Sequence, residues 1–228
     1  MYFKCDCIIN PGEIILNDKK VVPLRGQESE GAIELLEREV GYQGFFRLER
    51  YKLRHRLFAG GMGPTITREL FERGHAVAIL LYDALLDRIV LVEQFRIGAL
   101  KAEGGAWLYE IVAGIFEPGE EAEEVARRES VEEAGCEVGR IEKICDYLVS
   151  PGGTSETIAL YCGQVDSRGI GGVHGLDHED EDIRVFSVSY DESVELLKSG
   201  ELNSASPIMA IQWLQLNRER IRKEWAEG

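Results

Sequence analysis

A dense group of glutamates near the middle of the chain has the composition of a metal-binding site. Between Glu117 and Glu133 the sequence contains eight glutamates and only two basic residues, Arg127 and Arg128. Like charges at this density destabilise a helix unless a cation lies nearby. Carboxylate oxygens are the ligands that Mg2+ and Mn2+ prefer, and magnesium commonly bridges carboxylates to the phosphates of a substrate. The residue types therefore indicate metal-assisted phosphoryl transfer.

The spacing of these glutamates places three carboxylates on one face of the expected helix. At about 100° per residue, Glu129 and Glu133 are roughly 40° apart, and Glu132 is roughly 60° from Glu129. Val125 and Ala126 project in the same direction, so the carboxylates lie beside apolar side chains. An acidic face that only met solvent would have the opposite arrangement. The pattern favours a helix that presents acidic oxygens inward.

Strands and helices with clear patterns must position this acidic helix. Apolar runs, or runs bounded by turn residues, predict strands at 76–83, 88–95, 107–114, 141–149, 156–165 and 183–190. Helices are expected at 120–134, 191–198 and 205–225. The first of these helices follows the turn Pro118-Gly119, and Gly135 stands at a natural position for its carboxyl-terminal cap.

The amino-terminal part of the chain has a different pattern. Short apolar pieces broken by turn residues predict small antiparallel strands over residues 1–65, of which 44–57 is the clearest. Residues 33–40 fit either a helix or a strand. We therefore expect two domains, an antiparallel sheet at 1–65 and a larger domain at 66–228.

Composition excludes several classes of protein. A formal net charge of -15 opposes binding to nucleic acid, because such binding depends on lysine and arginine. No apolar run approaches the roughly 20 residues that a membrane span needs. The five cysteines include no CxxC pair, so neither a disulfide framework nor a zinc site is indicated. We expect a soluble, cytoplasmic protein that binds neither nucleic acid nor membrane.

Seven positions in this region match the fixed residues of the Nudix box, and the chain therefore resembles the Nudix hydrolase family. The seven are Gly114, Glu120, Arg128, Glu129, Glu132, Glu133 and Gly135. The resemblance runs from about Gly44 to Trp225 and is close to the bacterial ADP-ribose pyrophosphatases. It implies an α/β fold, a Nudix α/β/α sandwich with a mixed sheet, preceded here by the small antiparallel sheet.

The resemblance also implies a metal site. Its ligands would be Glu129, Glu133 and the backbone carbonyl of Ala113, with Glu132 as a further ligand. The expected cofactor is Mg2+, for which Mn2+ could substitute.

Catalytic roles follow from the same resemblance. The general base would lie on a loop after the box, where Glu179 is the matching residue and Glu181 a close competitor. Arg128 would orient the box carboxylates through an ion pair, with Glu120 as a candidate partner.

Substrate-binding residues are expected outside the helix. Arg68 and Arg96 are candidates for binding the diphosphate oxygens, with a structural ion pair as the alternative reading of each. Glu156 would contact a ribose hydroxyl. Gly114 suits a close approach of the backbone.

The expected reaction is the hydrolysis of ADP-ribose to AMP and ribose 5-phosphate. Two alternatives remain: hydrolysis of another nucleoside diphosphate sugar, such as GDP-mannose or a UDP-sugar, and a non-catalytic Nudix module that senses ADP-ribose. By resemblance the protein would be a homodimer with a swapped amino-terminal sheet that helps to complete the partner's substrate site.

Overall fold

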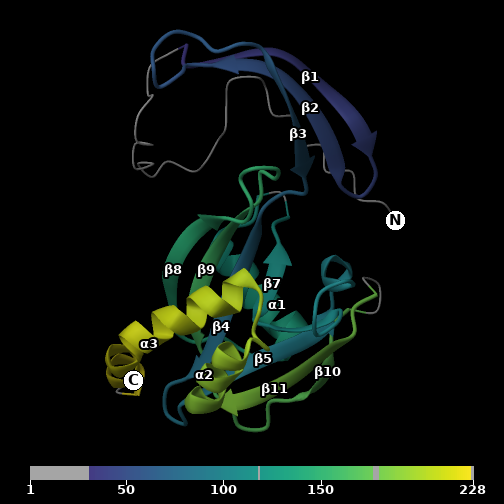
Figure 1. Cartoon of the computed structure of the whole chain (residues 1–228). Helices are drawn as coiled ribbons and strands as arrows, with labels where there is room; N and C mark the ends of the chain where they lie inside the picture. Colours follow the sequence, from purple (N-terminus) through teal and green to yellow (C-terminus); the bar gives the residue numbers. More distant parts are fainter. Residues whose placement is uncertain (1–30, 118, 177–179, 227–228) are drawn as a thin grey trace. The chain divides into compact units, whose positions relative to one another are not determined.

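A computed structural model describes residues 31–117, 119–176 and 180–226 of the chain (Figure 1). The chain divides into two compact units, Met1–Arg73 and Gly74–Gly228. The strands expected before residue 31 lie outside the described residues. Each unit is considered by itself below.

The first unit is a three-stranded antiparallel sheet. Its strands are β1 (Ile33–Gln43), β2 (Arg47–His55) and β3 (Ile66–Glu72), in the order β1-β2-β3. The segment that fitted either a helix or a strand is therefore strand β1. The predicted boundary after residue 65 falls just before β3, which pairs with β2 along seven positions and lies in the first compact unit.

One buried glutamate lies at the centre of this small sheet. The side chain of Glu49 on β2 is 0% exposed and forms ion pairs with Arg38 on β1 and Arg47 on its own strand. Tyr51 donates its hydroxyl to Glu49 Oε2 over 2.5 Å. Burial alone would raise the pKa of the carboxyl, but the bonds from Arg38 and Tyr51 and the nearby arginine charges lower it to about 2.

The second unit is built on an eight-stranded mixed sheet. Its strands are β4 (Ala76–Asp83), β5 (Arg88–Phe95), β6 (Trp107–Glu110), β7 (Val112–Ile115), β8 (Ile141–Leu148), β9 (Thr157–Gln164), β10 (Gly172–His174) and β11 (Ile183–Ser189). The main path is β10-β11-β5-β4-β9-β8, with β6 paired to β5 and β7 paired to β4. Strands β4 and β9 are parallel, whereas the other pairs are antiparallel.

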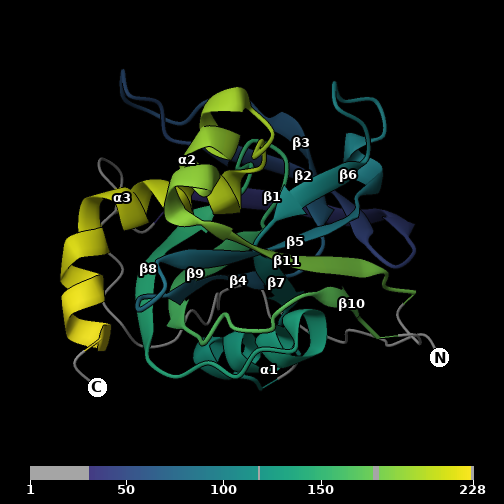
Figure 2. The same cartoon turned by 90° about the horizontal axis from the view of Figure 1, so that it is seen from below.

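Helices cover both faces of this sheet (Figure 2). Helix α1 (Ala122–Ala134) packs on one face, and α2 (Tyr190–Ser199) and α3 (Ala205–Ala226) pack on the other. A short 3-10 helix, η1 (Ile97–Ala99), follows β5. The predicted α/β/α sandwich is confirmed. Of the helices in the described residues, none is both long enough and apolar enough to cross a membrane.

Strand β4 forms the centre of the core because its side chains alternate between the two layers. All eight of its residues are buried. Val77, Ile79 and Leu81 belong to the apolar cluster that contains Val125 and Ala126 of α1. The alternate residues, from Ala78 to Tyr82, pack with the α3 side. This alternation holds one face of α1 against the sheet.

Helix α1 ends at Gly135, where the backbone takes the left-handed conformation that favours glycine. Its φ is 62°, and the N–H groups of Gly135 and Cys136 donate to the carbonyls of Val131 (3.0 Å) and Ser130 (2.9 Å). The last turn of the helix, which carries Glu132 and Glu133, is therefore fixed by its cap.

Candidate functional site

The carboxylate of Glu133 lies buried between α1 and β7. The residue is 2% exposed, and Glu133 Oε2 accepts a 3.0 Å hydrogen bond from the backbone N–H of Ala113. Burial raises the pKa of Glu133 to about 8; the Ala113 hydrogen bond opposes the shift, and the charge of Glu129 adds to it. The carboxylate of Glu133 thus accepts one hydrogen bond, from Ala113. A bound cation would stabilise its charged form, which burial and the charge of Glu129 disfavour.

The carboxylate of Glu129 lies directly over Gly114 on β7. A Cβ atom placed on Gly114 would be 1.8 Å from Glu129 Oε1, so only glycine leaves room for this side chain. Burial raises the pKa of Glu129 to about 7, although Arg128 lowers it, and the charges of Glu132 and Glu181 raise it further. The close backbone approach predicted at Gly114 accommodates a carboxylate of the helix.

Arg128 connects the acidic side chains of this region. Its guanidinium donates twice to Glu120, from Nε to Oε1 (3.0 Å) and from Nη2 to Oε2 (3.2 Å). Nη1 donates to Glu129 Oε1 and to Glu132 Oε2, both over 2.8 Å. A planar guanidinium fixes the direction of the carboxylates that it binds. Arg128 thus holds three glutamates in defined positions, including the predicted partner Glu120.

The donor set suits a hard divalent cation. Glu129 and Glu133 reach the same short strand, and burial there raises the pKa of both carboxyls despite the hydrogen bonds from Arg128 and from the Ala113 N–H. In an extended strand the N–H and C=O of one residue point to the same side, so the Ala113 carbonyl faces the edge where its N–H meets Glu133. Over the described residues, no three His, Cys, Asp or Glu side chains form a complete ligand group. Magnesium commonly takes its remaining ligands from water and substrate phosphates.

Arg96 lies near these carboxylates at the end of β5. Its Nε is 2.7 Å from Glu110 Oε2 on β6, and its positive charge lowers the pKa of Glu133. The side chain of Arg96 is 42% exposed. It therefore has both the structural ion pair and the open access to an anion that the sequence left as alternatives.

Glu181 lies close enough to influence the acidic face, the name used here for Glu129, Glu132 and Glu133 on α1. Its charge raises the pKa of Glu129 and of Glu133, and its Oε2 accepts a 3.2 Å bond from the N–H of Leu176. The Gly175 N–H, 3.4 Å from the Glu132 carbonyl, ties the start of this loop to α1. The other candidate base, Glu179, lies outside the described residues.

Glu156 precedes β9 at the same end of the sheet as Gly114. The residue is 6% exposed, and its N–H donates to Thr154 Oγ1 over 3.2 Å. Val77 of β4 is paired with Gly114 on one side and with Ala159 on the other. Glu156 is three residues before Ala159, a separation of about 10 Å along an extended chain.

Arg68 belongs to the other unit of the molecule. It is exposed on β3, and its Nη1 donates to the carbonyl of Thr67 over 2.8 Å. Its assignment to the diphosphate stays a prediction.

The sequence did not identify Glu110 as a residue of this region. The sequence of β6, WLYE, has no alternation that marks this residue, but Glu110 lies opposite Val92 of β5, whose side chain packs in the α1 layer. Cross-strand partners share a face, so Glu110 had to lie on the side of Arg96. Only the register of the two strands supplies that step.

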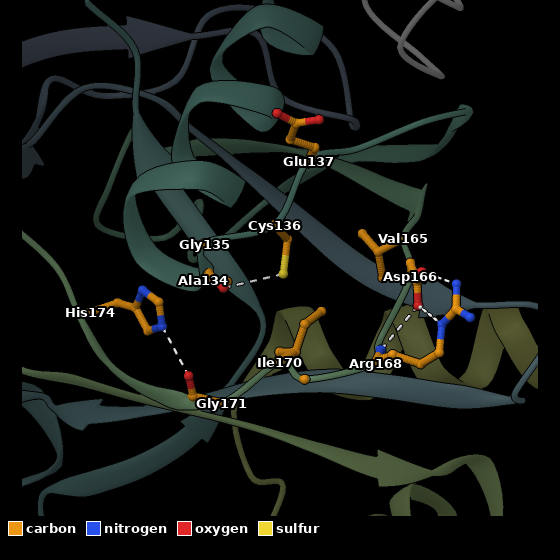
Figure 3. Close-up of a pocket in the computed structure, with 11 residues that line it drawn as sticks. Ala134, Gly135, Cys136, Glu137, Val165, Asp166, Arg168, Ile170, Gly171 and His174 are labelled. Carbon is orange, nitrogen blue, oxygen red and sulfur yellow. Dashed lines mark hydrogen bonds and ion pairs between the residues drawn. The ribbon is translucent and has the colours of Figure 1, made fainter.

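A separate pocket lies at the carboxyl-terminal end of α1 (Figure 3). Its volume is about 290 Å3, and its lining is formed by residues 134–137, 165–166, 168–171 and 174. Cys136 donates its thiol to the Ala134 carbonyl over 3.2 Å, and Arg168 pairs with Asp166. Among the described residues that line it, none is one of the acidic-face residues discussed above, so this pocket is distinct from that face.

The fold and the acidic face together define a Nudix protein. Residues 72–223 match the NUDIX domain family, two thirds of the chain, and the chain belongs to this family. The predicted family and the predicted enzyme class, a Nudix hydrolase, are confirmed.

Individual relatives can be aligned with most of this chain. An ADP-ribose pyrophosphatase from Escherichia coli (strain K12) is 46% identical over 194 residues, covering 85% of this chain and 93% of the relative. An ADP-ribose pyrophosphatase from Haemophilus influenzae is 41% identical over 200 residues, covering 86% and 92%. A GDP-mannose pyrophosphatase from Escherichia coli O1:K1 / APEC is 33% identical over 152 residues, covering 66% and 78%.

A crystal structure of an ADP compounds hydrolase has a similar fold. The two structures superpose with a TM-score of 0.63 at 19% sequence identity, covering 83% of this chain and 97% of the other. At this identity the likeness concerns the fold alone.

Proposed function

We propose that this protein is a magnesium-dependent pyrophosphohydrolase that cleaves ADP-ribose to AMP and ribose 5-phosphate, with Mn2+ as a possible substitute. The observation that carries the proposal is the placement of Glu129 over Gly114 and of Glu133 against Ala113, which gathers one buried and one partly buried carboxylate at one strand. The choice of substrate is supported by the relatives named ADP-ribose pyrophosphatase, which are 41% to 46% identical and match over more than nine tenths of their length.

The metal would be held by Glu129, Glu133 and the carbonyl of Ala113, with Glu132 as a further ligand. When bound, such an ion polarises the phosphoryl oxygens and offsets the negative charge that develops on them. Arg128 keeps the carboxylates in place through its bonds to Glu120, Glu129 and Glu132.

The remaining steps belong to other residues of the chain. Arg96, with Arg68 as a further candidate, binds the diphosphate oxygens and orients them for in-line attack. A water oxygen bonds to one phosphorus while the bridging P–O bond of the diphosphate breaks. The water proton passes to a carboxylate, for which Glu181 and Glu179 are the candidates. Glu156 contacts a ribose hydroxyl.

A panel of substrates tests this proposal. ADP-ribose, GDP-mannose and a UDP-sugar would be incubated separately with the enzyme and Mg2+, and the released mononucleotide measured. We expect AMP from ADP-ribose at the highest kcat/KM, and no product once a chelator removes the metal. A preference for GDP-mannose would select the alternative to which the 33% identical relative points. Tight ADP-ribose binding without any product would indicate the sensing module.

We further propose a homodimer formed through the amino-terminal sheet. Support comes from the large apolar side chains that this unit exposes, among them Ile33 (70%), Phe45 (82%) and Phe58 (97%). Light scattering should give the mass of two chains, and substitution of Phe45 and Ile33 by serine should shift it toward one chain. We also propose a cytoplasmic location, as the sequence predicts from cysteines that need no disulfide partners.

A further inference from the structure

The side-chain nitrogen of Gln94 on β5, Nε2, is buried and has no hydrogen-bond partner among the described residues. The residue as a whole is 6% exposed. Buried amide groups are nearly always bonded, because burial removes the water that would otherwise accept their hydrogens. Such a group in a native structure needs an explanation, and a ligand oxygen is one.

The strand geometry places Gln94 on the face that carries the acidic site. Val92, two residues earlier, packs in the apolar layer beneath α1, and side chains two apart in a strand point the same way. Arg96, two residues later, keeps an extended backbone (φ -127°, ψ 110°), and its N–H continues the ladder to Ala106 over 2.7 Å. Gln94 and Arg96 therefore share this face.

The ion pair between Arg96 and Glu110 crosses the position of Gln94. Glu110 lies opposite Val92, whereas Arg96 is four residues further along, about 13 Å for extended chain. Since Arg96 Nε and Glu110 Oε2 are nevertheless 2.7 Å apart, the two side chains lean toward each other over the intervening pair, Gln94 and Leu108. The unpartnered amide thus lies beside the guanidinium that we assign to the diphosphate.

We propose that Gln94 is a substrate-binding residue whose Nε2 donates a hydrogen bond to a non-bridging oxygen of the diphosphate bound by Arg96. This inference rests on the function proposed above. A neutral amide can donate a hydrogen bond to an anionic oxygen even where it is buried. A second positively charged side chain beside Arg96, buried without a carboxylate partner, would destabilise the protein. The Nε2 donor of Gln94 would add a hydrogen bond to the diphosphate beside Arg96, whose guanidinium is already in an ion pair with Glu110.

Two substitutions of similar size separate this role from a packing role. Gln94→Met keeps the volume but removes the donor, and we expect KM for ADP-ribose to rise roughly tenfold with a smaller change in kcat, as for the loss of one bond to a charged oxygen. Gln94→Glu replaces the donor by a carboxylate oxygen that repels phosphate, and KM should rise further. The thermal midpoint of ligand-free Gln94→Met should not fall, because the substitution removes a polar group that has no acceptor.

The matched control is Leu108→Met, which alters packing at the cross-strand partner of Gln94 without changing a polar group. It should leave KM unchanged. A wild-type KM in Gln94→Met, or an equal rise in Leu108→Met, would overturn the inference while leaving the proposed hydrolase intact. If the wild-type protein releases no mononucleotide from any of the three nucleotide sugars, the proposed function fails and this inference fails with it.

Discussion

Both units of this protein bury glutamates, but in opposite electrostatic surroundings. In the first unit, Glu49 is paired with Arg38 and Arg47 and bonded by Tyr51, and its pKa is lowered to about 2. In the second unit, burial raises the pKa of Glu129 to about 7 and that of Glu133 to about 8. The negative charge of Glu49 is balanced by arginines of its own sheet. The hydrogen bonds and positive charges around Glu129 and Glu133 do not offset the effect of burial.

This difference separates a structural charge from a functional one. A buried ion pair whose partners are all supplied by the fold has little left to offer a ligand. Buried carboxylates that lack sufficient cationic partners destabilise the free protein and become favourable when a cation arrives. The comparison therefore predicts that substitution of Glu129 or Glu133 will mainly reduce turnover, whereas substitution of Glu49 will mainly reduce the stability of the first unit.

The largest effect is expected from Glu133→Gln. The amide keeps the size of the side chain and an oxygen that can accept from Ala113, but it removes the charge. We expect kcat to fall about 1,000-fold, as for the loss of a major electrostatic contact in a transition state. The free energy of unfolding of the metal-free protein should stay the same or rise, because the neutral amide avoids the cost of protonating a carboxyl whose pKa folding raises to about 8. Steady-state kinetics and chemical denaturation measure the two quantities.

Glu124→Gln is the matched control for that substitution. Glu124 lies on the same helix but is exposed, so both turnover and stability should remain at wild-type values. If Glu133→Gln retained wild-type turnover, or lost stability without losing turnover, Glu133 would be structural and the comparison would fail.

The converse result is expected from Glu49→Gln. Removing this carboxylate leaves Arg38 and Arg47 facing a neutral group in a buried position, and the loss of one partner of a buried ion pair costs about 3 kcal/mol. Hydrogen exchange followed by mass spectrometry should show faster exchange in β1 and β2, with α1 and β7 unchanged. Glu39→Gln, which removes an exposed partner of Arg50 at 2.7 Å, should have much less effect. Equal effects of the two substitutions would show that burial of Glu49 has no special role.

Acid should reproduce the effect of Glu49→Gln. A carboxyl whose pKa is lower in the folded than in the unfolded protein stabilises the fold above its unfolded pKa, and that contribution is lost as pH falls toward the folded value. For Glu49 the window runs from about 4.5 down to about 2. By pH 3 the loss would be about 2 kcal/mol for a shift of this size. The exchange rates of β1 and β2 should rise over this window in the wild type, but hardly at all from this source in Glu49→Gln.

Much of the second unit could be predicted from the sequence because its signals are local. Strands β4 and β5 are largely apolar and were placed at their observed ends, and α1 was located by its periodicity and by Gly135. Residues 107–114 were expected as one strand but form two, since β6 pairs with β5 and β7 pairs with β4. Strand β3 was missed because its sequence, ITRELFE, lacks alternation and it is held by pairing with β2.

The candidate site divides in the same way. The face of α1 that carries Glu129 and Glu133 follows from helical spacing alone. The contacts of Gln94 and Glu110 depend on the register between β5 and β6, which is not encoded in a short stretch of sequence. Sequence patterns therefore predicted the site residues that lie on one helix, but not Gln94 and Glu110, which pairing between strands brings to the site.

The smallest effect, and the sharpest test of how closely the acidic face is fitted, is expected from Gly114→Ala. The added Cβ would lie 1.8 Å from Glu129 Oε1, so the flexible end of Glu129 must move. We expect kcat to fall roughly tenfold with little change in stability, because a small displacement of a catalytic group is costly for the reaction but not for the fold. Gly41→Ala on β1, where the added Cβ would meet the Leu48 carbonyl at an ordinary 3.6 Å, is the control in the other unit and should leave turnover unchanged. Wild-type turnover in Gly114→Ala would mean that Glu129 need not lie against β7, and that Glu133 alone sets the acidic face apart from the compensated Glu49.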